Sequence, residues 1–202
     1  DMIKTFSFLC MLLFSTLVNS ATLLILGDSL SAGYNMSIEH SWPSLLNEQL
    51  CKQNKPTMVI NASISGDTSG NGLARLPKLL AQHNPSTVLI ELGANDGLRG
   101  FAPQTVAANL EQIILLIQEQ GAQAILMQIA VPPNYGKRYT QAFSEIYPKL
   151  SQKHQLPLTP FFLEELLLNK PQWIMKDGLH PTQQAQPWIA QFMAKQLAPY
   201  LD

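Results

Sequence analysis

The stretch of sequence that decides the fold reads Leu23-Leu24-Ile25-Leu26-Gly27-Asp28-Ser29-Leu30. Its first four residues form a short apolar run, which favours a strand that is buried on both faces. The run stops abruptly at a turn of small residues that presents a serine. A serine at the end of a buried strand is well placed to act as a nucleophile.

The composition describes one ordinary compact domain. Of the 202 residues, 46% are hydrophobic and 13% are charged, and the formal net charge is −1. These values are those of a globular chain and not of a disordered or coiled one. The lysines and arginines are scattered and balanced by acids, so no basic stripe is available to neutralise phosphates. Neither a P-loop nor a dinucleotide fingerprint occurs, and we expect no nucleic-acid partner and no phosphate chemistry.

The first 20 residues have the pattern of an export signal. A lysine near the start precedes an apolar stretch over residues 6–18, and a small-residue pattern follows it. This stretch is shorter than the roughly 20 apolar residues that span a bilayer, so we expect cleavage after Ser20 and no stable membrane anchor afterwards. Asp1, which precedes Met2, is interpreted as foreign to the natural chain. The mature domain then covers residues 21–202 and is exported to a bacterial periplasm or beyond.

Apolar, β-rich runs alternate with helical patterns along the rest of the chain. The expected strands cover residues 22–26, 58–62, 87–92, 124–131 and 157–159. The expected helices cover residues 42–52, 72–82, 103–120 and 139–154, with a last helix that carries Trp188 and Leu197. The near-continuous apolar strands must be covered on both faces. The alternation therefore predicts a single domain with a doubly wound parallel sheet in a three-layer α/β/α arrangement.

The cysteine and three of the four histidines carry no catalytic signal. Cys51 is the one cysteine after the leader, so no intrachain disulfide is possible. It ends a helical stretch with no glycine turn beside it, and we expect a buried or half-buried structural thiol. His40, His83 and His154 fall on helix starts or polar faces and are interpreted as surface or capping residues. No carboxylate or cysteine spacing around them suggests a metal site.

Residues suited to chemistry follow each of the first four expected strands. Ser29 follows the first strand, Gly66 the second and Asn95 the third, and the loop over residues 131–135 follows the fourth. Taken alone, each is compatible with an ordinary turn. Ligands of open α/β sheets, however, bind outside the carboxyl ends of the strands. The four positions together therefore predict a site on one rim of the sheet.

The fourth histidine differs from the other three. His180 lies in a loop punctuated by glycine and proline, three residues after Asp177 and before the last helix. In so short a loop the carboxylate can accept the N–H of the imidazole Nδ1 and fix the tautomer in which Nε2 is the base. With a serine at the same rim, this pair indicates a Ser-His-Asp arrangement of the kind used in nucleophilic catalysis.

Four blocks of this sequence resemble those of the SGNH (GDSL) hydrolase family. The blocks are Gly27-Asp28-Ser29-Leu30, Gly66, Gly93-Ala94-Asn95-Asp96 and Asp177-Gly178-Leu179-His180. Residues 61–69, 93–101 and 132–136 are similar to its bacterial thioesterase and lysophospholipase members, and the likeness runs from about Thr22 to the C-terminus. Ala94 departs from the expected glycine, but the added methyl removes no functional group. The resemblance implies a flavodoxin-like fold, an exported location, no cofactor and broad hydrolysis of acyl esters and thioesters.

Carried over position by position, the resemblance gives each block a role. Ser29 would be the nucleophile, His180 the base that takes its proton and later protonates the leaving group, and Asp177 the residue that orients the imidazole. The oxyanion hole would consist of the backbone N–H groups of Ser29 and Gly66 and the side-chain amide of Asn95. We expect neither a cofactor nor a metal ion.

Apolar residues near the same rim offer a surface for an acyl chain. They are Leu98, Phe101, Val131, Pro132 and Tyr135. The segment over residues 97–101 has glycines in it and could act as a mobile lid. Because coenzyme A is cytoplasmic, export favours lysophospholipids and other lipid esters as substrates, and we expect a monomer.

Two alternatives stay open at this point. A carbohydrate O-deacetylase of the same family would need a short open pocket in place of an apolar groove. A catalytically silent lipid-binding protein on the same scaffold is disfavoured by the intact Ser29, Asp177 and His180.

Overall fold

The structure, a computed structural model, describes residues 21–202. The expected leader and its cleavage point after Ser20 lie outside the described residues. Within that range the strands are β1 (Ala21–Gly27), β2 (Thr57–Asn61), β3 (Thr87–Glu91), β4 (Gln123–Met127) and β5 (Leu158–Thr159). The α-helices there are α1 (Ser29–Ala32), α2 (Trp42–Cys51), α3 (Ser69–His83), α4 (Ala94–Leu98), α5 (Pro103–Glu119), α6 (Lys137–Ser144), α7 (Ile146–His154), α8 (Phe162–Asn169) and α9 (Gln186–Leu197).

The five strands form one parallel sheet in the order β2-β1-β3-β4-β5. The first strand, β1, lies in the interior of the sheet. From it the chain moves outward to β2 and then returns to β3 on the other side of β1. This is the flavodoxin-like strand order, in which the reversal between β1 and β3 opens a crevice at the carboxyl ends of these two strands.

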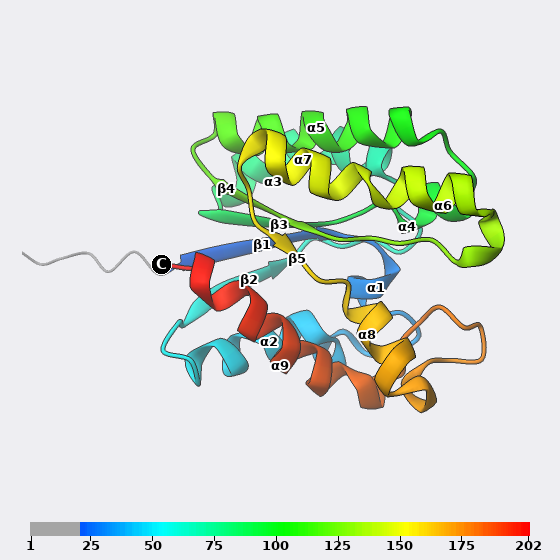
Figure 1. Cartoon of the computed structure of the whole chain (residues 1–202). Helices are drawn as coiled ribbons and strands as arrows, with labels where there is room; N and C mark the ends of the chain where they lie inside the picture. The colour runs from blue at the N-terminus through cyan, green and yellow to red at the C-terminus, as the bar shows by residue number, and fades with distance from the viewer. Residues whose placement is uncertain (1–20) are drawn as a thin grey trace, which may run out of the picture.

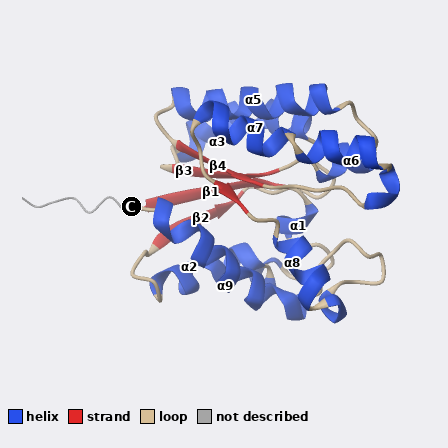
Figure 2. Cartoon of the chain, in the orientation of Figure 1, coloured by secondary structure: helices blue, strands red, loops and turns tan. Residues whose placement is uncertain are grey.

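Helices cover both faces of the sheet. The helices α3, α5, α6 and α7 lie on one face, and α2, α8 and α9 lie on the other (Figure 1). Figure 2 shows the strands as a central red layer between two blue layers of helices. This arrangement confirms the predicted doubly wound three-layer α/β/α fold in a single domain.

The central strands account for the apolar runs in the sequence. Every residue of β3 is buried, and so is every residue of β1 except Thr22. Strands in the middle of a parallel sheet touch helices on both faces, so their side chains must be apolar on both sides. The edge strand β2 is less covered, and its Met58 is 60% exposed.

The third predicted helix agrees well with the structure, and the second begins earlier than predicted. Helix α5 buries the aliphatic face that its sequence periodicity indicates. Helix α3 begins at Ser69, three residues before the predicted start. A capping box holds this first turn, because the Thr68 hydroxyl accepts the Asn71 N–H and the Asn71 side chain accepts the Thr68 N–H.

The long helix predicted over residues 139–154 is in fact two helices, α6 and α7, divided at Glu145. Pro148 explains the break, because proline has no N–H to donate to the carbonyl of Ser144 and its ring clashes with that carbonyl. The Ser144 carbonyl instead accepts from the side-chain amide of Gln128 at 3.1 Å.

Three further predictions need correction. The strand predicted over residues 124–131 ends at Met127, because its neighbour β5 is only two residues long. Cys51 is exposed, since it follows the buried Leu50 by one position and points about 100° away from it around α2. His154 is no simple surface residue: its Nε2 lies 2.7 Å from Glu111 Oε1, and its side chain is 12% exposed.

Helix α8 was not predicted. It has eight residues and begins at Phe162, and its N-cap residue, Phe161, makes no capping hydrogen bond through its side chain. Its run of leucines includes both buried and exposed positions, so the sequence lacks the clear periodicity that marks α5. This helix matters for the site because it follows β5 at the functional rim of the sheet.

Candidate active site

The turn after β1 places Ser29 at the start of α1. Asp28 is the N-cap of this helix, and its Oδ1 accepts the N–H of Leu30 at 2.9 Å. The turn is tight, because a Cβ at Gly27 would lie 2.8 Å from Ser63 Oγ and 2.9 Å from Glu91 Oε1. Glycine at this position lets the strand end against its neighbours and present the serine at the rim.

A continuous chain of hydrogen bonds joins the serine to an acid. Ser29 Oγ lies 2.8 Å from His180 Nε2, and His180 Nδ1 lies 2.6 Å from Asp177 Oδ2. With the Nδ1 proton held by the carboxylate, Nε2 is free to accept the hydroxyl proton. The imidazole is mostly enclosed, with 15% of its side chain exposed. The structure therefore brings together the three residues that the sequence singled out.

The loop that carries His180 is built by Asp177. The Asp177 Oδ1 accepts the N–H groups of Leu179 at 2.9 Å and of His180 at 3.0 Å. Burial tends to raise the pKa of the Asp177 carboxyl, but these two backbone bonds and the imidazole outweigh it and leave the pKa below its ordinary value. The ends of the loop are tied by an antiparallel bridge between Ile174 and Pro181. Asp177 is therefore held as an anion beside the imidazole.

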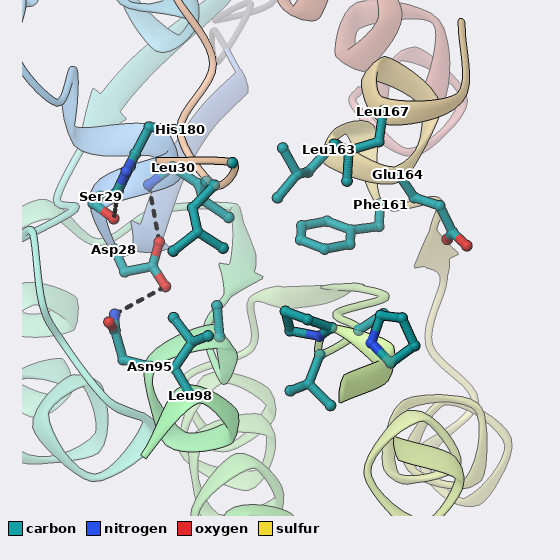
Figure 3. A pocket seen from close by; sticks show the side chains of 17 residues that line it. Asp28, Ser29, Leu30, Asn95, Leu98, Phe161, Leu163, Glu164, Leu167 and His180 are labelled. Atoms are coloured by element: carbon teal, nitrogen blue, oxygen red, sulfur yellow. Dashed lines mark hydrogen bonds between the residues drawn. The ribbon is translucent and has the colours of Figure 1, made fainter. Parts of the chain in front are cut away.

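Asn95 follows β3 and reaches across to the turn after β1. Its side-chain amide donates to the carbonyl of Asp67 at 2.9 Å. It also donates to Asp28 Oδ2 at 3.3 Å (Figure 3). Gly66 precedes Asp67 in the loop after β2 and has a φ of +86°, a conformation that favours glycine. The amide of Asn95 thus links the loops that follow β1 and β2. Asn95 makes these hydrogen bonds with Ala94, and not the expected glycine, before it.

Arg75 holds the loop that carries Gly66, and sequence reasoning missed it. Its Nε lies 2.7 Å from Asp67 Oδ2, and its guanidinium also donates to the carbonyl groups of Ala62 and Gly27. One side chain on α3 therefore fastens both ends of this loop and the end of β1. An arginine within a helix gave no signal of this role, because two of its three partners are backbone carbonyl groups, which residue types do not reveal.

Two acidic side chains lie beneath the nucleophile. Burial raises the pKa of Asp28 to about 6. Glu91 is fully buried at the end of β3, and burial together with the Asp28 charge raises the pKa of its carboxyl well above the ordinary value. Two adjacent buried carboxyl groups cannot both ionise easily. The N–H groups of Leu30 and Asn95 face Asp28, so Asp28 is the ionised member and Glu91 carries the proton.

A further aromatic contact was not predicted. The ring of Tyr34 stacks on the imidazole of His180, with ring centroids 3.8 Å apart and an angle of 16° between the planes. Tyr34 follows Gly33, which ends α1 with a φ of +81°. No pattern in the sequence predicts this contact, because Tyr34 and His180 lie far apart in the chain.

An apolar cavity of about 320 Å³ opens beside Ser29. Figure 3 shows Phe161, Leu163 and Leu167 on the side of the cavity opposite Ser29 and His180, whereas the Glu164 carboxylate points away from it. The full lining comprises Asp28, Ser29, Leu30, Ala94, Asn95, Leu98, Ala130, Val131, Pro132, Pro133, Phe161, Leu163, Glu164, Leu167, Gly178, Leu179 and His180. Its volume lies at the lower end of the range typical of ligand pockets, roughly 300 to 1,000 Å³.

The structure divides the five predicted acyl-binding residues. Leu98, Val131 and Pro132 line the cavity, whereas Phe101 and Tyr135 lie outside its lining. The Tyr135 hydroxyl instead donates to the Leu98 carbonyl at 2.8 Å, and the neighbouring Tyr139 hydroxyl donates to the Phe101 carbonyl at 2.7 Å. These two bonds tie down the segment that the glycines suggested as a lid.

Residues 21–202 were searched for a membrane-spanning helix and for a metal site. No helix in this range is long and apolar enough to cross a membrane. In the same range, no three histidine, cysteine or acidic side chains gather closely enough to hold a metal ion.

Known proteins resemble this chain over nearly all of its length. Residues 25–186 match the GDSL-like lipase/acylhydrolase family. The chain is 60% identical to an arylesterase of Vibrio mimicus over 182 residues, which cover 90% of each protein. It is 56% identical to thioesterase 1/protease 1/lysophospholipase L1 of Escherichia coli K12 over 197 residues, which cover 98% of this chain and 92% of the relative.

Solved structures agree with the sequence comparison. The esterase EstA from Pseudoalteromonas sp., in a form inhibited by monoethylphosphonate, superposes with a TM-score of 0.84 at 41% identity and covers 89% of this chain and 97% of its own. TesA superposes with a TM-score of 0.83 at 43% identity and covers 89% of this chain and 99% of its own. From the match to most of its length and these relatives, the chain belongs to the GDSL-like lipase/acylhydrolase family and is a GDSL-type serine esterase.

Proposed function

We propose that this protein hydrolyses acyl esters and thioesters through an acyl-enzyme intermediate on Ser29, with His180 and Asp177 as the other members of the triad. The observation that carries the proposal is the unbroken line from Ser29 Oγ to His180 Nε2 at 2.8 Å and from His180 Nδ1 to Asp177 Oδ2 at 2.6 Å. Each atom in this line has the partner that proton transfer requires.

In the first half of the reaction, Ser29 Oγ attacks the acyl carbonyl while His180 Nε2 takes the hydroxyl proton. The imidazolium is held by the anionic Asp177, and it then gives its proton to the leaving alcohol or thiol. In the second half, a water molecule attacks the acyl-enzyme as His180 removes its proton, and the returning proton releases Ser29 and the carboxylic acid.

The oxyanion of each tetrahedral intermediate needs donors. The proposed donors are the backbone N–H groups of Ser29 and Gly66 and the side-chain amide of Asn95. Asn95 lines the cavity beside Ser29, and its two amide N–H groups donate to the Asp67 carbonyl at 2.9 Å and to Asp28 Oδ2 at 3.3 Å. The oxyanion would take the N–H that now makes the longer bond, to Asp28. The support for Gly66 is its loop, which Arg75 fastens to the end of β1.

The apolar cavity supports a substrate with an acyl chain. Leu98, Val131 and Leu163 offer hydrocarbon surface next to the nucleophile. Each methylene buried there contributes about 0.8 kcal/mol. Lipid esters such as lysophospholipids fit this surface, and two relatives are named for arylesterase and for thioesterase and lysophospholipase activity.

We propose that the leader is cleaved and that the mature protein is a monomer in the periplasm. The leader pattern in residues 1–20 supports export. The Escherichia coli relative aligns with 98% of this chain, so the alignment reaches into that segment. Acyl-CoA stays in the cytoplasm, and lipid esters are therefore the better everyday substrates.

The test uses the purified protein and p-nitrophenyl esters of increasing acyl length. We expect kcat/KM to rise over several carbons and then level off where the cavity ends. If kcat/KM is highest for the acetyl ester and falls with every added carbon, the carbohydrate O-deacetylase becomes the better assignment. Binding of fatty acid without turnover of any ester would identify a silent lipid-binding protein.

A further inference from the structure

The imidazole of His180 is contacted on one face as well as at both nitrogens. The ring of Tyr34 covers that face, with 3.8 Å between the centroids and 16° between the planes. The two residues come from separate parts of the chain, the turn after α1 and the loop before α9. We propose that Tyr34 is a positioning residue that holds the His180 ring and stabilises its imidazolium form while the Ser29 proton is in transit.

The geometry of the stack favours a charged ring over a neutral one. Neutral aromatic pairs prefer offset or edge-on arrangements with centroids about 4.5 to 7 Å apart over a close face-to-face stack. A cation lying over an aromatic face within about 6 Å is attracted by the ring quadrupole. The nearly parallel contact at 3.8 Å between Tyr34 and His180 is thus better suited to imidazolium than to imidazole.

This inference rests on the proposed function, in which His180 becomes positively charged only after it takes the serine proton. Asp177 at Nδ1 provides one source of stabilisation for that charge. Tyr34 provides a second from a direction perpendicular to the ring. An interaction that strengthens between the bound substrate and the transition state raises kcat and leaves KM unchanged.

The turn that carries Tyr34 is fixed by its two neighbours. Gly33 has a φ of +81° and Asn35 a φ of +53°, the residue types that tolerate this region best. A Cβ at Gly33 would lie 3.2 Å from the Cβ of Ser41. The half-buried tyrosine is therefore held by backbone conformation between two reversals of the chain, which keeps its ring in place against the histidine.

The experiment compares Tyr34→Phe, which keeps the ring, with Tyr34→Leu, which keeps apolar bulk but has no quadrupole. Tyr200→Leu is the matched control, since Tyr200 is 40% exposed in the turn that follows α9. With p-nitrophenyl butyrate, we expect Tyr34→Leu to lower kcat by roughly 3- to 30-fold at constant KM. Tyr34→Phe and Tyr200→Leu should keep the wild-type kcat.

A second readout follows the same step without turnover. The rate at which a p-nitrophenyl phosphonate inactivates Tyr34→Leu should fall in proportion to kcat/KM, because His180 must take the serine proton there as well. Thermal unfolding of each variant checks that the fold is intact. If Tyr34→Leu fails to fold, Tyr34→Met gives the same comparison with a more flexible side chain.

The possible results separate this inference from the proposed function. Full kcat in folded Tyr34→Leu, or a change in KM alone, would overturn the role of the stack while leaving the esterase proposal intact. A Tyr34→Phe variant as slow as Tyr34→Leu would overturn it too, because the hydroxyl and not the ring would then be responsible. The proposed Ser29 mechanism fails separately, if the wild-type protein has no turnover that depends on Ser29.

Discussion

Single side chains of the site gain their reactivity from the partner that each one contacts. Ser29 has an ordinary hydroxyl, and only the nearby His180 Nε2 gives it a route for losing its proton. His180 in turn depends on Asp177, which fixes both its tautomer and the loop that carries it. Residues that act as one unit lose function together, and their substitution effects do not add.

The first prediction concerns this unit. Ser29→Ala and His180→Ala should each remove nearly all hydrolysis of p-nitrophenyl butyrate, and the double variant should be hardly slower than either single one. Stability should change little, because neither side chain belongs to the apolar core. Steady-state kinetics with circular dichroism as a folding control measures this. Strong turnover by folded Ser29→Ala would remove Ser29 as the nucleophile.

The second prediction concerns the proposed oxyanion hole. Asn95→Ala deletes a donor that acts in the transition state, so kcat should fall by roughly 10²- to 10³-fold with a small effect on KM. Asn95→Asp should be no better, because a carboxylate offers an acceptor in place of a donor. A variant that altered only KM would show that Asn95 binds the substrate without stabilising the oxyanion.

The third prediction concerns the buried Asp28. Its pKa in the folded protein is about 6 against an ordinary 3.8, so the folded state binds this proton more tightly than the unfolded state does between these values. The associated stability is therefore fully present below about pH 4 and is lost as the pH rises through about 6. The loss is about 3 kcal/mol at most, from 1.36 kcal/mol for each pKa unit.

Asp28→Asn is the matching variant, because asparagine caps a helix as well as aspartate does. Urea unfolding of both proteins between about pH 4 and pH 7 gives the difference in their free energies of unfolding. We expect the wild type to lose free energy of unfolding relative to Asp28→Asn as the pH rises. A difference that stays constant across the range would show that Asp28 has an ordinary pKa.

Helices and strands with a clear period could be predicted from the sequence, and those without one could not. The five apolar or β-rich runs all became strands, and α5 has the buried face that its spacing indicates. The predicted strand through residue 131 was too long, because strand length depends on a pairing partner that periodicity does not reveal. Helix α8 was missed for a related reason, since three of its four leucines line the cavity or are exposed to solvent.

That missed helix leads to the fourth prediction. Leu167 and Leu168 are neighbours on α8, with exposed fractions of 47% and 73%, but only Leu167 lines the cavity. Leu167→Ser should therefore lower kcat/KM for an octanoyl ester by roughly 4- to 10-fold and leave an acetyl ester unchanged. Leu168→Ser should change neither. Equal effects of the two variants would show that the acyl chain does not lie along α8.

The whole molecule creates the site by the order of its strands. Reversal between β1 and β3 leaves a crevice at their carboxyl ends, and Ser29 and Asn95 follow those two strands. This part of the site could be predicted because each residue directly follows an apolar run. Three other features could not be predicted: the stacking of Tyr34 on His180, the hydrogen bonds of Arg75 and the cavity lining from α8. They depend on contacts between different elements of the fold.

The central claim is that Ser29 forms the covalent intermediate, and covalent labelling tests it most directly. The purified protein is treated with monoethyl p-nitrophenyl phosphonate, and peptide mass spectrometry then locates the adduct while ester hydrolysis is measured in parallel. We predict that the adduct forms on Ser29 alone and that activity is lost in proportion to its occupancy. Complete loss of activity with the adduct on another residue, or full activity with Ser29 fully modified, would contradict the account.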